Sequence, residues 1–220
     1  MLVHANGIDI YYKQTGSGRP LLILHGNSEN HTKYSGLAEA LSREYSVYTP
    51  DTRCHGKSTK TSGISYIDMM EDIRAFIAEL GLKKPLLIGA SDGAITGLLL
   101  AINYPSLLSG LIACGANTHP SQLKTSFRVL AKLGFAVTKS PKLRLMLKEP
   151  NITPDDLGKI DIPVLVLAGE KDVVSEAVTR EIASAIPGSE VKIVPHETHT
   201  SYLLHHDRFL TATQKFLQHI

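Results

Sequence analysis

The chain has 220 residues, enough for one domain with a sizeable core and too few for two of ordinary size. Hydrophobic residues make up 43% of it and charged residues 20%, the balance of a globular protein, and no apolar run approaches the length that spans a membrane. The net charge of +2 gives no electrostatic reason to expect a nucleic-acid partner, and we expect no membrane partner either.

Two features of the sequence indicate a compartment. The chain has only two cysteines, Cys54 and Cys114, which are too few for a disulfide framework and favour a reducing environment. Residues 1–16 lack the charged and then apolar pattern of a signal peptide and are typical of strands instead. The sequence therefore predicts a cytoplasmic protein.

In the first part of the chain, predicted strands are followed by helices. Asn6-Gly7 tolerates positive φ at both positions and predicts a hairpin between two strands. Residues 20–24 form a continuous apolar run, typical of a strand buried on both faces of a sheet. The expected elements up to residue 80 are strands at 2–5, 8–14, 20–24 and 45–49, and helices at 30–44 and 67–80.

The second part keeps the same alternation. The expected strands are 85–88, 108–113, 162–168 and 191–194, and the expected helices are 94–104, 176–186 and 203–220. Strands that alternate with helices of ten to fifteen residues predict the α/β class. We expect a mostly parallel, eight-stranded sheet flanked by helices, with right-handed connections.

Residues 118–161 interrupt this alternation. They are basic, contain four prolines and have only scattered apolar residues. We expect short helices over the carboxyl edge of the sheet, as a cap insertion within a single domain that spans residues 1–220. The cap is expected to line the acyl or alcohol pocket, although most of its apolar side chains are expected to bury a small satellite core instead: Phe127, Leu130, Leu133, Phe135, Leu143, Met146 and Leu147. An insertion of this length predicts a relatively open site.

The segment Gly89-Ala90-Ser91-Asp92-Gly93 carries the strongest chemical signal. It fits G-x-S-x-G, the nucleophile elbow, and it lies between a predicted strand and a predicted helix. A strand that turns into a helix within a few residues presses neighbouring backbones together, so that a Cβ at either glycine would clash. The alternative is an ordinary glycine-rich turn. In the elbow, Ser91 is exposed at a helix N-terminus and is the candidate nucleophile.

A nucleophilic serine needs a base, and the base needs an orienting acid. In this kind of fold the chain order is serine, acid, histidine. Asp172 follows the predicted strand 162–168 and is the favoured acid, with Glu170 as the alternative. His199 follows the last predicted strand and is the favoured base, with His196 as the alternative.

Two backbone N–H groups are expected to form the oxyanion hole. One belongs to Asp92, directly after the serine, and the other to Asn27, after the strand that ends at His25-Gly26. The His25 side chain is expected to hold loops together by hydrogen bonds. The segment His196-Glu197-Thr198-His199 has the wrong spacing for a zinc motif and no cysteine near it, so we expect no metal site and no cofactor.

The order of these motifs resembles that of the α/β-hydrolase family over essentially the whole chain. The motifs are His25-Gly26, Asp51-x-Arg53-x-His55-Gly56-x-Ser58, Gly89-x-Ser91-x-Gly93, Gly169-x-x-Asp172 and His199. The resemblance implies the α/β-hydrolase fold, a Ser91–His199–Asp172 triad and a structural role for the Asp51–Ser58 turn. Cys54 stands where the family usually has glycine, which implies a slightly altered loop.

A narrower resemblance concerns the valacyclovir hydrolase branch of this family. It is carried by Ser91-Asp92-Gly93-Ala94-Ile95-Thr96, Tyr104-Pro105 and Gly115-Ala116-Asn117. It implies that Asp92 favours substrates with an α-amino group, and it makes Asn117 a candidate substrate contact. We favour the alternative that Asp92 caps its helix and complements the helix dipole, because Ala94 replaces a usual glycine and the insertion is short.

Together the motifs predict a serine hydrolase that cleaves small carboxylic esters through an acyl-enzyme, with amides and thioesters as further candidate substrates. The same triad also serves C–C bond hydrolases and acyltransferases in this fold. A non-catalytic sensor of a small ligand is an alternative of a different class.

Overall fold

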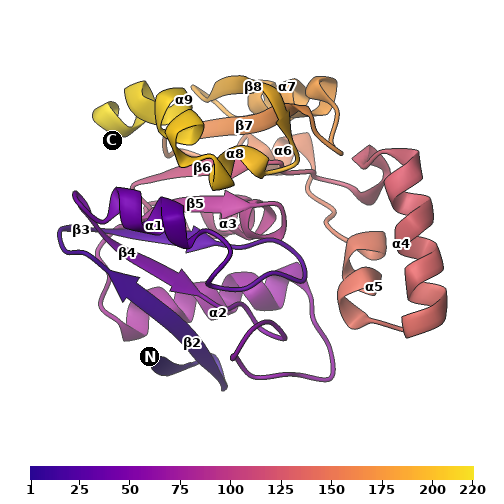
Figure 1. Ribbon diagram of the computed structural model, residues 1–220, viewed down its shortest axis with the longest axis horizontal. Helices are drawn as coiled ribbons and strands as arrows, with labels where there is room; N and C mark the ends of the chain where they lie inside the picture. Colours follow the sequence, from indigo (N-terminus) through magenta and orange to yellow (C-terminus); the bar gives the residue numbers. More distant parts are fainter.

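The computed structural model describes all 220 residues, and its core is one eight-stranded sheet. The strands are β1 (Leu2–Ala5), β2 (Ile8–Thr15), β3 (Arg19–Leu24), β4 (Tyr45–Pro50), β5 (Leu86–Ala90), β6 (Gly110–Cys114), β7 (Val164–Lys171) and β8 (Glu190–Thr198). Their spatial order is β1-β2-β4-β3-β5-β6-β7-β8 (Figure 1). The pairs β1–β2 and β2–β4 are antiparallel and all others are parallel, which confirms the predicted class and strand number.

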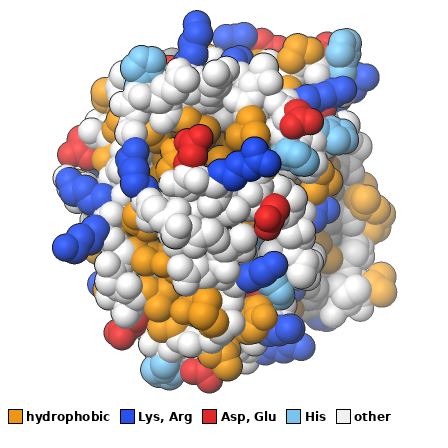
Figure 2. All heavy atoms as spheres, turned by 60° about the vertical axis from the view of Figure 1, so that its left-hand side comes forward, with side chains coloured by type: hydrophobic (Ala, Val, Ile, Leu, Met, Phe, Trp, Pro, Cys, Tyr) orange, Lys and Arg blue, Asp and Glu red, His pale blue; other side chains and the backbone are white.

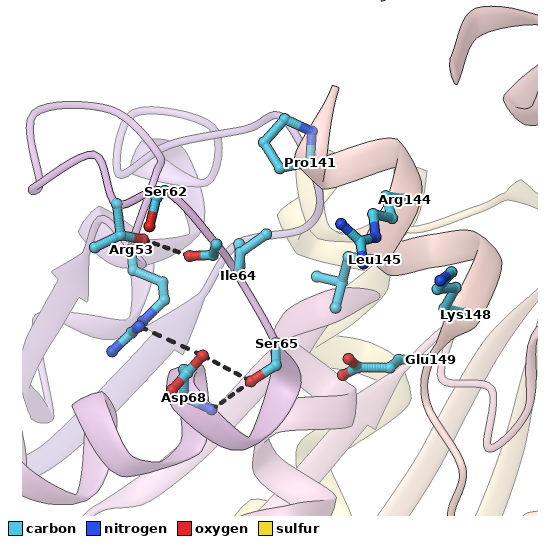
Figure 3. Close-up of a pocket in the computed structure, with 12 residues that line it drawn as sticks. Arg53, Ser62, Ile64, Ser65, Asp68, Pro141, Arg144, Leu145, Lys148 and Glu149 are labelled. Carbon is cyan, nitrogen blue, oxygen red and sulfur yellow. Dashed lines mark hydrogen bonds and ion pairs between the residues drawn. The ribbon is translucent and has the colours of Figure 1, made fainter. Parts of the chain in front are cut away.

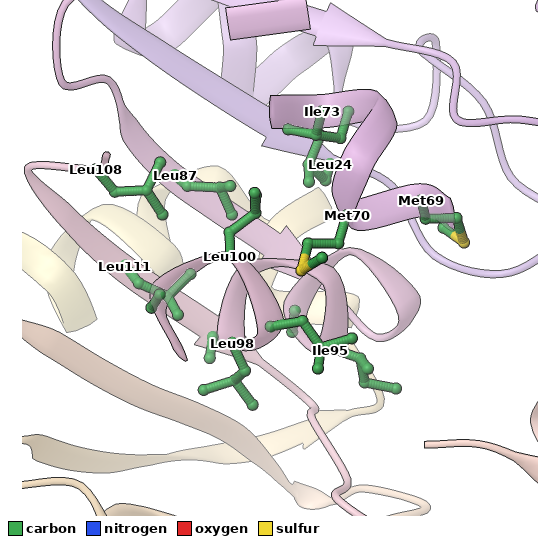
Figure 4. Close-up of a cluster of buried hydrophobic side chains, with 14 of the residues drawn as sticks. Leu24, Met69, Met70, Ile73, Leu87, Ile95, Leu98, Leu100, Leu108 and Leu111 are labelled. Atoms are coloured by element: carbon green, nitrogen blue, oxygen red, sulfur yellow. The ribbon is translucent and has the colours of Figure 1, made fainter. Parts of the chain in front are cut away.

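Helices cover both faces of the sheet. They are α1 (Ser35–Leu41), α2 (Tyr66–Glu79), α3 (Asp92–Asn103), α4 (Thr125–Thr138), α5 (Pro141–Lys148), α6 (Pro154–Leu157), α7 (Glu176–Ala185), α8 (Ser201–Leu204) and α9 (His206–His219), with a short 3₁₀ helix, η1 (Pro120–Gln122). Buried residues of α2, α3 and α7 form one core cluster with one face of the sheet (Figure 4), and α1, α8 and α9 form the other core cluster. No helix has the length and apolarity needed to cross a bilayer.

Strand β3 explains why the central strands read as unbroken apolar runs. Leu21 and Ile23 belong to the cluster under α1 and α9, whereas Leu22 and Leu24 belong to the cluster under α2 and α3. Successive side chains point to opposite faces of a strand, and here both faces are covered by helices. Alternation between polar and apolar residues is therefore absent from this strand.

The cap lies between β6 and β7, where the sequence predicts an insertion. Figure 1 shows α4 and α5 beside the body of the molecule, beyond the carboxyl ends of the central strands. Helix α4 has 14 residues and is longer than the short helices that we expected. Its outward side chains do not bury a satellite core: Leu130 is 69% exposed and Leu133 61% exposed, so that expectation is wrong for this face of the helix.

Two predicted helices differ from those in the structure. The predicted helix 203–220 is two helices, α8 and α9, because His205 leaves the helical conformation at φ −89° and ψ 67°. Its side chain is held outside the helix by a hydrogen bond from Nδ1 to the buried Glu197. The predicted helix 30–44 is reduced to α1, since the Asn30 side chain accepts hydrogen bonds from Thr32 and stabilises a turn there instead.

Candidate active site

Ser91 lies between the end of β5 and the start of α3, in a strained backbone conformation. Its φ is 51° and its ψ −112°, and its N–H donates to the Cys114 carbonyl at 2.8 Å. A Cβ at Gly89 would lie 2.3 Å from the Gly93 carbonyl oxygen, and one at Gly93 would lie 2.4 Å from the Leu24 carbonyl oxygen. Both flanking glycines are thus required by close backbone packing, and the strand–turn–helix context that the motif needs is present.

His199 and Asp172 form a hydrogen-bonded pair at the carboxyl ends of β7 and β8. The His199 Nδ1 lies 2.6 Å from Asp172 Oδ1, which also accepts a hydrogen bond from the Val174 N–H at 2.9 Å. Asp172 is buried, so it holds the imidazole from the inside of the protein. Because Nδ1 is bonded to a carboxylate, the Nε2 atom of His199 is left as a proton acceptor.

Gly115 is a site residue whose packing role the sequence reasoning missed. Its φ is +63°, and a Cβ there would lie 2.8 Å from His199 Cε1 and 3.4 Å from Asp172 Oδ2. The imidazole therefore packs directly on the backbone after β6. A glycine directly after a predicted strand was the available signal, but a glycine in this place is also common in ordinary turns.

A small cavity brings the predicted residues together. It is lined by Ser91, Asp92, Asn117 and His199 from the sheet side, and by residues that include Phe127, Met146 and Glu149 from the cap. The space open to the centre of a water molecule is about 20 Å³, roughly the room for one water. The space beside the serine is narrower than the relatively open site that we expected, although Ser91 and His199 both keep part of their surface exposed.

The loop after β3 lies against the serine. A Cβ at Gly26 would be 3.3 Å from the Ser91 Cβ, and the Gly26 N–H is fixed by the Glu29 carboxylate at 2.9 Å. The N–H groups of Asn27 and Asp92 make no hydrogen bond within the protein. Both N–H groups that the sequence predicts for the oxyanion hole are thus without a partner in the protein.

The Asp92 carboxylate is buried and has two hydrogen-bond donors. Tyr66 Oη donates to Oδ1 at 2.8 Å, and Asn27 Nδ2 donates to Oδ2 at 2.9 Å. Burial raises the pKa of Asp92 above its ordinary value, and these two hydrogen bonds oppose that shift. The interpretation of Asp92 as a helix cap is wrong, because its side chain bonds to other segments and not to the N–H groups of α3, although it does lie in the first turn.

Glu170 and His196, the alternative acid and the alternative base, contact each other outside the cavity. The Glu170 carboxylate accepts a hydrogen bond from the His196 N–H at 2.7 Å, and its Oε2 lies 3.6 Å from the ring Nδ1. The His196 side chain is 80% exposed. His196 does not line the cavity that Ser91 and His199 share, and Glu170 bonds to His196, whereas Asp172 bonds to His199.

An irregularity in β8 separates the two histidines. Gly169 pairs with Val194, but two residues further along β7 the partner of Lys171 is Thr198, four residues further along β8. The bulge leaves His196 outside and buries Glu197, which binds Ser201, His205 and Arg208. His196 is thus exposed, Glu197 is buried and His199 lies at the cavity. No group of three or more potential metal ligands exists in the chain.

The segment between β4 and α2 is a structural support. His25 Nε2 accepts a hydrogen bond from the Thr52 N–H at 3.1 Å, as expected for a residue that joins loops. Burial lowers the pKa of His25, so its neutral form is favoured. Cys54 adopts φ +64°, which is the conformation that glycine tolerates best, so the departure from the family pattern falls on a left-handed residue.

A second, larger pocket borders the small cavity and was not predicted. It has a volume of about 510 Å³ and lies between α5 and the segment that leads into α2 (Figure 3). Arg144 and Lys148 line it from the cap, and Asp68 lines it from α2. Glu149 lines both spaces, and its Oε2 accepts a hydrogen bond from the Tyr66 N–H at 3.0 Å. Glu149 therefore borders both the larger pocket and the cavity at the serine.

Known proteins with the same features place this chain in a family. The sequence profile of the alpha/beta hydrolase fold matches residues 19–137, more than half of the chain. Serine hydrolase BPHL of Homo sapiens is 27% identical over 249 aligned residues, which cover 98% of this chain and 85% of that protein. The pimeloyl-[acyl-carrier protein] methyl ester esterase of Aliivibrio salmonicida is 22% identical over 254 residues, covering 95% of this chain and 96% of that protein.

Among solved structures, the esterase EaEST from Exiguobacterium antarcticum has the same fold. Its TM-score to this chain is 0.87 at 21% sequence identity, with 99% of each chain covered. The strand order, the strained serine after β5 and the matching sequence profile agree with one another. The chain belongs to the α/β-hydrolase fold family.

Proposed function

We propose that this protein is a serine hydrolase that cleaves small carboxylic esters through an acyl-enzyme, with Ser91, His199 and Asp172 as its catalytic triad. The observation that carries the proposal is the 2.6 Å contact between His199 and buried Asp172 at the cavity where Ser91 stands on its strained turn. Membership of the α/β-hydrolase fold family and the similarity to a serine hydrolase and to an esterase support it.

The first half of the reaction acylates the serine. Ser91 Oγ attacks the carbonyl carbon while its proton passes to Nε2 of His199, and Asp172 stabilises the imidazolium that forms. The N–H groups of Asn27 and Asp92 donate to the oxyanion of the tetrahedral intermediate. The intermediate collapses as the C–O bond breaks, and His199 gives its proton to the departing alcohol.

The second half restores the enzyme. A water attacks the acyl carbon and gives a proton to His199, the same N–H groups hold the second oxyanion, and Ser91 leaves with that proton as the acid is released. Asn117, which lines the cavity, is the polar side chain that we propose meets the bound substrate, whereas the Asp92 carboxylate, held by Tyr66 and Asn27, positions the oxyanion hole. The cavity beside Ser91 has room for roughly one water, so the cap side chains that line it shift when a substrate binds.

The proposal is tested by turnover of short-chain p-nitrophenyl esters and by labelling with a fluorophosphonate probe. Ser91→Ala should lose the label and nearly all turnover. Asp172→Asn should lower kcat about 10⁴-fold, because the imidazole loses its orienting carboxylate. Matched controls are Glu170→Gln and His196→Gln, which alter the exposed pair and should keep near wild-type rates.

Different outcomes identify different functions. If Ser91 is labelled but esters are not turned over, C–C bond hydrolysis or acyl transfer by the same triad becomes the better assignment. If Ser91 resists the probe, the protein is better described as a sensor of a small ligand. Equal losses in Glu170→Gln and Asp172→Asn would overturn the assignment of the acid.

A further inference from the structure

The outer face of α4 is apolar and has no protein to pack against. Val129 is 50% exposed, Leu130 69%, Leu133 61% and Val137 84%. These four residues are half of the large hydrophobic side chains that the protein exposes, and their spacing places them on one side of the helix. The opposite side of α4 carries buried Ala131 and the cavity-lining Phe127. The helix therefore has one apolar face that packs on the protein and a second, exposed apolar face that is typical of an interaction surface.

The same two cap helices carry a concentrated positive charge. Residues 124–148 hold seven of the 23 lysines and arginines of the chain and none of its 21 acidic residues. The seven are Lys124, Arg128, Lys132, Lys139, Lys142, Arg144 and Lys148. None of them forms an ion pair in the structure. The rest of the chain is net negative, so the overall charge of +2 hides a strong asymmetry.

Outside the cap helices the charges are mixed, with 16 lysines and arginines against 21 acidic residues. Figure 2 looks at the molecule from another side, where acidic, basic and histidine side chains are interspersed. In Figure 1, α4 and α5 stand apart from the sheet and its flanking helices, so a flat surface can approach α4 from outside. A helix with an exposed apolar face, cations beside that face and no acidic residue of its own has the composition of a helix that lies in a lipid interface.

Against the expectation of no membrane partner that the overall composition gave, we propose that the outer face of α4, with the neighbouring cations of α4 and α5, docks onto an anionic lipid surface. Val129, Leu130, Leu133 and Val137 enter the boundary between headgroups and acyl chains, while the long stems of Lys132 and Lys139 reach back to the headgroups. Each cation near such a surface strengthens the electrostatic attraction to it. A second copy of this chain fits less well, because its cap would bring seven more cations against these seven.

The orientation that follows places the cap between the lipid and the serine. Phe127 contacts the cavity from the inner face of the same helix whose outer face is docked. The docking surface itself does not depend on catalysis, so it can be measured without any substrate and on the Ser91→Ala variant. A failed lipid experiment would consequently leave the proposed hydrolase function untouched.

The experiment is co-sedimentation with vesicles of phosphatidylcholine containing phosphatidylglycerol, and with vesicles of phosphatidylcholine alone. We expect binding to the anionic vesicles that weakens as salt is added, and little binding to the neutral ones. Leu133→Ser should lower the affinity about tenfold or more, because the apolar area of one leucine side chain is no longer buried on binding. The matched control is Leu2→Ser, which changes a leucine of similar exposure, 64%, on β1 at the far edge of the sheet.

The contribution of the cations is tested by a double variant. Lys132→Gln combined with Lys139→Gln should reduce both the affinity and its dependence on salt. The proposal is overturned if the wild type does not bind anionic vesicles, or if Leu133→Ser and Leu2→Ser bind equally well. It is also overturned if sedimentation without vesicles shows self-association that Leu133→Ser abolishes, since the face would then belong to a second copy. Circular dichroism of each variant verifies that the fold is intact.

Discussion

Asp92 fixes the loop that carries Asn27: its Oδ2 accepts a hydrogen bond from Asn27 Nδ2 at 2.9 Å. The same Nδ2 also donates to the Lys142 carbonyl of the cap at 3.3 Å. The two residues that offer free N–H groups beside the serine are therefore joined to each other through their side chains. The buried Asp92 carboxylate therefore positions one residue of the proposed oxyanion hole, and the cap contacts the same Asn27 side chain through the Lys142 carbonyl.

Replacing Asp92 by asparagine tests this positioning. The amide keeps one oxygen for two donors, so either Tyr66 or Asn27 loses its acceptor, at a cost of about 1–3 kcal/mol of unfolding free energy. We expect kcat to fall about tenfold or more with little change in KM, equally for esters with and without an α-amino group. Tyr66→Phe is the comparison variant, since it removes one hydrogen bond and leaves Asn27 anchored. A rise in KM confined to amino esters would show that Asp92 recognises the substrate instead.

The elbow glycines provide a test of packing. Gly89→Ala places a Cβ 2.3 Å from a carbonyl oxygen of the next helix, and neither backbone can yield without moving the nucleophile. We expect a loss of about 3 kcal/mol or more of unfolding free energy, measured by urea denaturation, and loss of fluorophosphonate labelling. Gly63→Ala should stay near wild type, because nothing lies within 4 Å of its Cβ. Comparable losses in both variants would show that steric contact is not the cause.

A buried ion pair holds the turn after β4 to α2. Arg53 Nε lies 2.6 Å from Asp72 Oδ2 and Nη2 lies 2.6 Å from Oδ1, and both side chains are nearly or fully buried. Asp72→Ala leaves the guanidinium without this partner, so we expect about 3–5 kcal/mol of destabilisation in urea. Arg180→Ala removes an exposed pair with Glu176 and should cost less than about 1 kcal/mol. The prediction fails if the two variants are equally stable.

The stability of the protein should fall in mild acid. His55 is buried, and burial, together with His25, lowers its pKa from 6.5 to about 4. The unfolded chain takes up a proton near pH 6.5 and the folded protein does not, so the stability is complete above that pH and is lost as the pH falls toward 4. The loss is on the order of 3 kcal/mol. Urea denaturation at several pH values measures it, and His55→Gln should start less stable but show a shallower decline. An unchanged decline in that variant would assign the effect to other groups.

Much of the fold could be predicted because two-sided burial and helical spacing are local patterns. The run from Leu21 to Leu24 predicts a central strand without any knowledge of what lies beside it, and β3 is central in the sheet. Boundaries were less accurate where a side chain at the end of an element binds a distant group. His205 is such a case, because its partner Glu197 belongs to another element.

In the site, too, local motifs could be predicted from the sequence and contacts between distant segments could not. Ser91, Asp172 and His199 could be proposed from motif order, and the structure brings Ser91 to the same cavity as His199 and joins Asp172 to that histidine. The role of Asp92 could not, because its partners Tyr66 and Asn27 come from two other segments. The basic character of residues 118–161 was visible in the sequence, but the exposure of Leu130 and Leu133 beside these cations was not, because burial depends on how the cap packs.

The irregular pairing of β8 with β7 makes the length of one segment matter more than its composition. His196 and its exposed neighbours could be exchanged for other polar residues with little effect on the core. Deleting a single residue between Val194 and Thr198 would reverse which side chains face inward, since side chains alternate along a strand. Glu197 would then be exposed and His199 would no longer reach Asp172. In an alignment of functional variants of this chain, this stretch should tolerate substitutions and reject insertions and deletions.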